Sequence, residues 1–281
     1  MRKTMFSFAL FLLLAVAARA QEGNRYVVPL SKPGEPVRLE VSLVSGSISV
    51  EPHPGNDVVV EAAPGSDEDD DHEDSDSDRD SDRSSHGRTA GMHKLPNRSL
   101  GLVVEEEANK VSVGMGGIPR DVTLHILVPR NTSGTLSTVN NGEIKVQGLE
   151  GTLELNNVNG GITALEVAGS VIAHTTNGDV KVTMARVDPK AALAFASFNG
   201  DVDISLPPGS HGDLRMRSDN GEIYTDFDVA LSNAPAKVES ARRGGKYHLE
   251  VEQEVRGLLG GGGPEIQLRT FNGDIYLRKH G

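Results

Sequence analysis

Short runs of alternating apolar and polar residues follow glycines that recur at a constant interval in the middle of the chain. The interval is nine residues for Gly142, Gly151, Gly160, Gly169 and Gly178. After most of these glycines the second and fourth residues are apolar, and the residues between them are mostly polar. The apolar pairs are Ile144 and Val146, Leu153 and Leu155, Val171 and Ala173, and Val180 and Val182. This period of two predicts short β-strands with one buried face.

The same register continues toward the C-terminus with small insertions. The later apolar pairs are Leu193 and Phe195, Val202 and Ile204, Leu214 and Met216, Ile266 and Leu268, and Ile275 and Leu277. The inserted residues fall in loop-like sequence such as 187–190 and not within the strands. Insertions that collect between units are typical of stacked repeats.

Six Asn-Gly pairs mark every second turn of this pattern. Their asparagines are Asn141, Asn159, Asn177, Asn199, Asn220 and Asn272. Asn-Gly is a strong hairpin signal, so an antiparallel β-meander is one interpretation. A β-solenoid explains the alternation better, because one coil of about 18 residues would hold two short strands and a single Asn-Gly turn. The asparagines would then form a ladder along one edge, each bonded to the next.

Less regular strands are predicted on either side of this region. In the N-terminal half they are Val37–Val44, Ser47–Val50, Val58–Glu61, Leu100–Val104, Lys110–Val113 and Val122–Val128. Residues 226–263 interrupt the register. We expect this excursion to contain one strand or short helix and a flexible loop.

The first 20 residues have the features of a removable export signal. Arg2 and Lys3 precede an apolar run from Phe6 to Ala18, and small residues flank Arg19 at the expected cleavage site. The run is short for a transmembrane helix. We therefore expect a signal peptide at residues 1–20 and a single β-solenoid domain at residues 21–281.

An acidic insertion at residues 64–99 interrupts this domain. Eleven acidic residues lie between Asp67 and Asp82, with no aliphatic residue among them. Such a segment buries too little apolar surface to offset its chain entropy, which predicts disorder. Its alternating aspartates resemble part of a calcium loop, but Arg79 and Ser85 stand where an EF-hand has glycine and glutamate. We therefore expect a solvated acidic loop.

Composition narrows the classes of function. The chain contains no Cys, which excludes a disulfide scaffold, a thiolate zinc site and a cysteine nucleophile. Its net charge of −12 argues against binding to nucleic acid or to an anionic membrane surface. The histidines lack the spacing of a zinc site, and neither a nucleophile elbow nor a phosphate loop is present. We assign no catalytic residue, no cofactor-binding residue and no metal ligand.

Three carboxylates nevertheless define an alternative function. Asp201, Asp203 and Glu222 could approach one another on neighbouring coils, as the paired carboxylates of polysaccharide-cleaving enzymes do. Aromatic residues that would hold a sugar are scarce, at 4% of the chain with no Trp. Tyr224 and Tyr276 are the only outward aromatic residues that the pattern places. A glycosidase or lyase is therefore the second hypothesis.

The motifs of the repeat resemble those of a known family. Val128-Pro129, the recurring Asn-Gly-Asp/Glu-Ile/Val units and the closing segment Thr270–Ile275 are similar to the bacterial putative-adhesin family, formerly a domain of unknown function. The resemblance covers most of the chain from about Val37, apart from the acidic insertion. It implies a right-handed β-solenoid exposed on or outside the bacterial envelope, and it implies no catalytic residues.

Together these features predict a non-enzymatic exported envelope protein, periplasmic or extracellular, with an adhesin-like binding or scaffolding surface. The partners expected are a cell-envelope polymer or another envelope protein. We expect no nucleic acid, no cofactor and no transmembrane segment after removal of the signal. The sequence specifies neither the ligand nor the oligomeric state.

Overall fold

The computed structural model describes residues 24–65, 101–116, 121–232, 237–243, 246–252 and 254–281, and every regular element in them is a β-strand. Twenty strands form one sheet, whereas β18 (Lys237–Arg243) and β19 (Lys246–Glu252) form a separate antiparallel hairpin. The prediction of an all-β chain is confirmed. The predicted signal peptide at residues 1–20 and residues 66–99 of the predicted acidic insertion lie outside the described residues.

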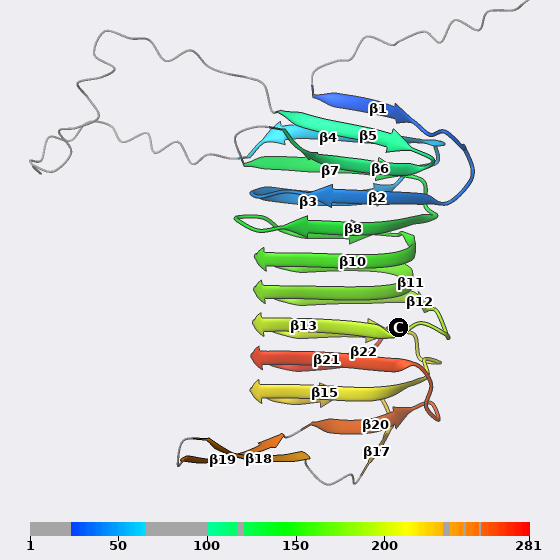
Figure 1. Cartoon of the computed structure of the whole chain (residues 1–281). Coiled ribbons are helices and arrows are strands. Elements are labelled where there is room, and N and C mark those ends of the chain that lie inside the picture. The colour runs from blue at the N-terminus through cyan, green and yellow to red at the C-terminus, as the bar shows by residue number, and fades with distance from the viewer. Residues whose placement is uncertain (1–23, 66–100, 117–120, 233–236, 244–245, 253) are drawn as a thin grey trace, which may run out of the picture.

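Most strands stack in two parallel ladders. The first ladder faces the viewer in Figure 1. Its order is β6 (Lys110–Met115), β2 (Val37–Ser42), β8 (Thr132–Thr138), β10 (Glu150–Asn159), the second half of β11 (Ile162–Asn177), β13 (Leu193–Asn199), β21 (Glu265–Asn272) and β15 (Gly212–Asn220).

The second ladder lies behind the first and repeats its order. It contains β7 (Val122–Val128), β3 (Gly46–Pro52), β9 (Ile144–Gln147), the first half of β11, β12 (Val180–Val187), β14 (Val202–Leu206), β22 (Ile275–Lys279) and β16 (Ile223–Thr225). We call one strand from each ladder, together with the turn that joins them, a rung.

The register of the central rungs follows the glycine interval. Gly151 lies opposite Gly169, and Ile162 lies opposite Val180, in both cases a shift of 18 residues. β11 belongs to both ladders, because its first half pairs with β9 and its second half pairs with β13. Between the two halves, Glu166 takes a positive φ of 53°. The strands of the Asn-Gly region pair with one another in parallel, which excludes the antiparallel meander there.

The rungs do not stack in the order of the chain. The rung of β2 and β3 lies between the rung of β6 and β7 and the rung of β8 and β9. Likewise, the rung of β21 and β22 lies between the rung of β13 and β14 and the rung of β15 and β16 (Figure 1, where β21 is red). Two segments distant in sequence are thus enclosed by rungs from the middle of the chain.

Antiparallel strands cover most of the ends of the stack. At one end, β5 (Leu102–Glu107) pairs with β6, and β4 (Asp57–Pro64) pairs with β7 and with β1 (Arg25–Pro29). At the other end, β20 (Val255–Leu259) pairs with β15 and with β17 (Val229–Leu231). Such strands limit the open edges of a parallel stack. The excursion at residues 226–263 therefore holds four strands, β17 to β20, and not the single strand or short helix expected from the sequence.

The core lies between the two ladders and is built by the alternation seen in the sequence. Val180, Val182 and Ile204 are completely buried, as the alternation predicts, and Phe195 is the largest fully buried side chain among the described residues. Outward positions between them, such as Lys181, are exposed. Each strand of the two ladders therefore contributes one apolar face to a single core.

A column of polar side chains connects each turn to the adjacent rung at the edge of this core. Each donates a hydrogen bond of 2.8 Å to the carbonyl of a glycine one rung away. The donors are Thr138, Asn157, Thr175, Ser197, Thr270 and Ser218. Because a buried carbonyl without a partner is costly, this column fixes the spacing of the turns.

Candidate functional site

The carboxylates that follow the Asn-Gly turns form a column on the outer face of the second ladder. The backbone N–H of Asp201 donates to Oδ1 of Asp179, that of Asp274 to Oδ1 of Asp201, and that of Glu222 to Oδ1 of Asp274, each at 2.8 Å. One oxygen of each aspartate therefore accepts a hydrogen bond from a backbone N–H of the next rung. The result is a column of aligned negative charge on this face.

The three carboxylates that the sequence singled out share this face but do not converge. Asp274 lies between Asp201 and Glu222, whose backbones are thus two rungs, or about 9.6 Å, apart. Asp203 instead binds Arg278, with 2.8 Å between Oδ1 and Nε. Sequence reasoning missed Asp274 as a member of the group, although its Asn-Gly-Asp motif is the same as that of Asp201.

Two tyrosines stack beside the carboxylate column. The rings of Tyr224 and Tyr276 have centroids 5.3 Å apart and an interplanar angle of 11°. The Tyr276 hydroxyl donates to Oδ2 of Asp274 at 3.0 Å, and this bond raises the pKa of the phenol above its usual value. Both tyrosines therefore belong to the outer face, as predicted, and Tyr276 connects the ring pair to the carboxylates.

Arg278 lies over one ring of this pair, that of Tyr276. Its guanidinium carbon is 4.8 Å from the centroid of the Tyr276 ring. The hydrogen bond to Asp203 raises the pKa of this guanidinium further. This end of the second ladder thus combines carboxylates, phenol rings and one paired cation in adjacent columns.

An asparagine ladder runs along the turn edge, where each side-chain amide donates to the amide oxygen of the next. The N···O distances range from 2.7 to 3.3 Å. The order in space is Asn140, Asn159, Asn177, Asn199, Asn272 and Asn220. Asn140 takes the place predicted for Asn141, which instead adopts a positive φ of 50°. The ladder therefore starts one residue earlier than the Asn-Gly motif indicates.

Two outward phenylalanines accompany this edge. The rings of Phe198 and Phe271 stack with centroids 4.8 Å apart, and the residues are 51% and 40% exposed. The expectation that Tyr224 and Tyr276 are the only outward aromatic residues is therefore wrong. Phe198 and Phe271 directly precede the ladder asparagines and continue the outward alternation at the ends of β13 and β21, beyond the apolar pairs that the sequence pattern identifies.

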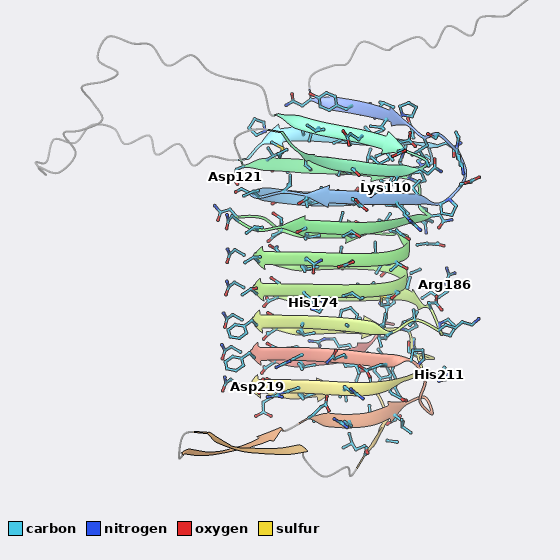
Figure 2. All side chains as sticks on the ribbon, viewed as in Figure 1. Lys110, Asp121, His174, Arg186, His211 and Asp219 are labelled. Atoms are coloured by element: carbon cyan, nitrogen blue, oxygen red, sulfur yellow. The ribbon has the colours of Figure 1, made fainter. Side chains whose placement is uncertain are left out.

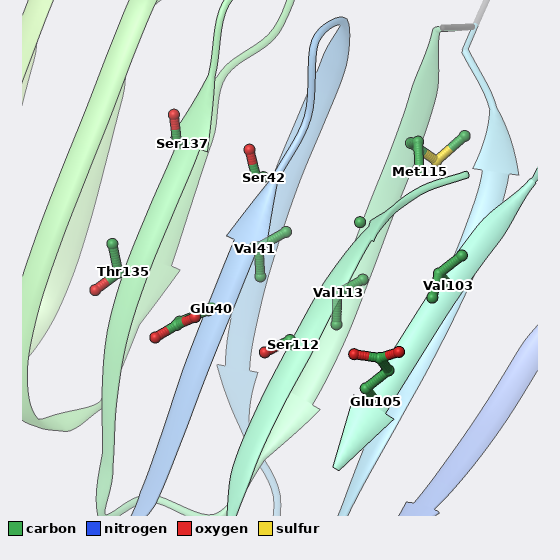
Figure 3. A pocket seen from close by; sticks show the side chains of 11 residues that line it. Glu40, Val41, Ser42, Val103, Glu105, Ser112, Val113, Met115, Thr135 and Ser137 are labelled. Carbon is green, nitrogen blue, oxygen red and sulfur yellow. The ribbon is translucent and has the colours of Figure 1, made fainter. Parts of the chain in front are cut away.

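The outer face of the first ladder is hollowed near β5. A groove of about 550 Å³ crosses β5, β6, β2 and β8. Its wall combines hydroxyls, two carboxylates and apolar side chains, as Figure 3 shows. The lining side chains include Glu40, Ser42, Val103, Glu105, Ser112, Met115, Thr135 and Ser137.

Gly114 accounts for part of the hollow. It lines the groove, and a Cβ built on it would meet only one backbone oxygen, that of Ser42 at 3.9 Å. Lys110 pairs with Glu40 at 2.9 Å, whereas the Glu105 carboxylate has no hydrogen-bond or ion-pair partner within the described part of the chain. The groove can therefore accept hydrogen bonds from a ligand and cover apolar surface.

The histidines that the structure describes do not form a site of their own. His174 lies exposed on the face of the first ladder (Figure 2). His125, on the second ladder, is 3.4 Å from Glu61 and 3.7 Å from Glu51. No group of three or more acidic or histidine side chains in the described residues is arranged to hold a metal ion. In the same residues there is no helix with the length and hydropathy needed to cross a bilayer.

Comparisons with known proteins give one distant structural relationship. No family model matches the chain, and no curated protein matches it. The structure is similar to the crystal structure of a "putative cell adhesion protein" from Clostridium sporogenes, with a TM-score of 0.44 and 10% sequence identity. The similarity covers 91% of this chain and 99% of that chain.

Proposed function

We propose that this protein is a non-enzymatic binding or scaffolding protein of the bacterial envelope, with an adhesin-like role. The groove on the first ladder is the observation that carries this proposal. It crosses four strands that hydrogen bonding holds in register, so it is a rigid, concave surface. Rigid repeat surfaces serve recognition more often than chemistry.

The groove fits an extended, polyhydroxylated polymer of the cell envelope. Its hydroxyls both donate and accept hydrogen bonds, and its two carboxylates, Glu40 and Glu105, accept them. Val103 and Met115 supply apolar contact beside these groups. A chain of sugars presents the same mixture of hydroxyls and C–H surface.

The variant Gly114→Leu tests this function. The new side chain would occupy the groove, and the glycine site has room for its Cβ and no positive φ. Ala196→Leu is the matched control, because it adds leucine to the outer face of the same ladder on β13. Retention of the purified protein on isolated cell-envelope material should fall at least tenfold for Gly114→Leu and remain unchanged for Ala196→Leu. Equal retention of both variants and the unmodified protein would refute a binding role for the groove.

A polysaccharide-cleaving enzyme is the second candidate, and the carboxylate column beside the tyrosine pair favours it. Loss of an acid or base lowers turnover by orders of magnitude. Asp201→Asn and Glu222→Gln would therefore abolish the release of reducing sugar from an envelope polysaccharide if the protein were an enzyme. A binding protein releases no such sugar, and these variants would leave its retention nearly unchanged.

The remaining elements of the proposal concern architecture and location. We propose a right-handed solenoid with about 18 residues per coil, related to the bacterial adhesin-like family named above. The domain would span residues 21–281 after removal of a signal peptide at residues 1–20, with the acidic insertion at 64–99. N-terminal sequencing of the exported protein should begin at Gln21, and an intact N-terminus would contradict export by this signal.

A further inference from the structure

The ring of Tyr224 has one open face at the end of the second ladder. β16, which carries it, pairs with β22, and no other described strand pairs with β16. One face of the ring stacks on Tyr276, yet the residue remains 50% exposed. The exposed surface therefore includes the face that points away from the stack.

The neighbouring tyrosine shows what such a face binds in this protein. Arg278 lies over the Tyr276 ring and also bonds to Asp203 on β14. Because β14 and β16 flank β22 on opposite sides, the guanidinium covers the face of Tyr276 opposite Tyr224. Cation, phenol ring and carboxylate thus form one unit, in which the ring quadrupole and the carboxylate both attract the cation.

The open face of Tyr224 has a phenol ring and a nearby carboxylate, as Tyr276 does, but no cation lies over it among the described residues. Glu222 precedes the tyrosine by two residues on the same outer face, and its carboxylate has no partner among the residues that the structure describes. Asp201 and Asp274 extend the negative charge along the column. The chain as a whole carries a net charge of −12, which also favours the approach of a cationic partner.

We propose that Tyr224 and Glu222 form a recognition site for a cationic side chain, a guanidinium or an ammonium group, of a partner protein. The inference builds on the proposed function, since it names the chemistry of one partner of the envelope protein. It concerns a different surface from the groove, on the opposite ladder and near the other end of the stack. The two sites can therefore be tested separately.

A short arginine peptide is the probe. Tri-arginine with blocked termini is titrated into the full chain at low salt, and tyrosine fluorescence reports binding because the chain has four Tyr and no Trp. Tyr224→Ala should weaken binding several-fold, and Glu222→Gln should weaken it to a similar degree. Tyr224→Phe keeps the ring and should bind as the unmodified protein does. Raised salt should weaken binding throughout.

Three controls make the result decisive. Thr163→Ala, on the same outer face but distant from Tyr224, should not change binding, and thermal unfolding verifies that each variant is folded. A neutral oligosaccharide titrated in parallel should not bind at this site. The proposal is overturned if Tyr224→Ala binds tri-arginine as the unmodified protein does, or if the oligosaccharide binds there and the peptide does not. Retention on envelope material that still depends on Gly114 would then show that the proposed function stands without this site.

Discussion

Substitution of Gly178 by alanine should strongly destabilise the protein. Gly178 lies in the turn between β11 and β12 with a φ of +142°, and an added Cβ would lie 2.5 Å from the carbonyl oxygen of Gly160. The obstacle is the backbone of the adjacent rung, which cannot rotate away as a side chain could. Alanine at this position therefore meets both conformational strain and a steric conflict.

The size of the effect follows from these two contributions. A positive φ costs a residue other than glycine about 1–2 kcal/mol. Relief of the clash separates the rungs of Gly160 and Gly178. It weakens the two hydrogen bonds that join them there, from the Gly160 N–H to the carbonyl of Asn177 and from the Thr175 hydroxyl to the carbonyl of Gly160, at about 1 kcal/mol each. The expected loss in the free energy of unfolding is about 3–4 kcal/mol.

Two further glycines separate the contributions. Gly34 has a φ of +89° and no atom within 4 Å of an added Cβ. Gly34→Ala should therefore lower the free energy of unfolding only by the cost of the backbone strain, about 1–2 kcal/mol. Gly209 has neither a positive φ nor a close neighbour, so Gly209→Ala should change stability by about 0.5 kcal/mol or less. Urea unfolding followed by circular dichroism measures all three variants. If Gly178→Ala were no less stable than Gly34→Ala, the close approach of the turns would not limit the residue at this position.

Further predictions concern the core, the column of polar side chains at its edge and the tyrosine pair. Val180→Asp should prevent folding, because it buries a charge at a cost of several kcal/mol, whereas Lys181→Asp should cost about 0.5 kcal/mol or less in urea unfolding. Thr270→Val should cost about 1–2 kcal/mol in the same assay, since it leaves a glycine carbonyl without its donor. The raised pKa of Tyr276 means that its stabilising effect is complete below pH 10.0 and is lost as the pH rises through the folded-state pKa. Asp274→Asn should accordingly lower the pKa of this one phenol in an ultraviolet titration, and an unchanged titration would contradict the role of the carboxylate.

The sequence predicts the rungs well, because each rung follows from local rules. Alternation identifies Val180 and Ile204 as inward residues, and both are completely buried. The asparagine ladder is predicted for the same reason, since a residue that recurs once per coil must line up along one edge. The displacement from Asn141 to Asn140 was not predictable, because Asn140-Asn141-Gly142 offers two candidate residues for one place.

The order in which rungs stack could not be predicted from the sequence. Every rung presents a similar edge of backbone N–H and C=O groups, so the periodicity does not determine which rung adjoins which. Only tertiary packing places β21 next to β13. The column of polar side chains, in contrast, is visible in the sequence, although the sequence analysis did not identify it. A Ser, Thr or Asn precedes each ladder asparagine by two residues, for example Thr175 before Asn177 and Ser197 before Asn199.

The groove and the Tyr224 site lie beyond what the alternation shows. The pattern of outward residues does not place Gly114 and Glu105 in one groove with β2, because β3, β4 and the acidic insertion separate β2 from β5 and β6 in the sequence. Tyr224 and Tyr276 are both expected to point outward, but their stacking depends on the insertion of β22 beside β16. Both sites thus arise where rungs from distant parts of the chain meet.

The position of the rung of β21 and β22 has a consequence for how the protein acquires its structure during synthesis. The rungs from β8 and β9 to β13 and β14 can be added one after another as the chain grows. β15 and β16 cannot join them in turn, because their parallel partners are β21 and β22, which are made later. Residues 212–225 must therefore wait without a parallel partner until residues 265–279 are available, and the final rungs then close together as one cooperative step. A ribosome-bound chain that ends before residue 265 should accordingly hold a folded middle, followed by a segment that is not docked on it and is exposed to proteases.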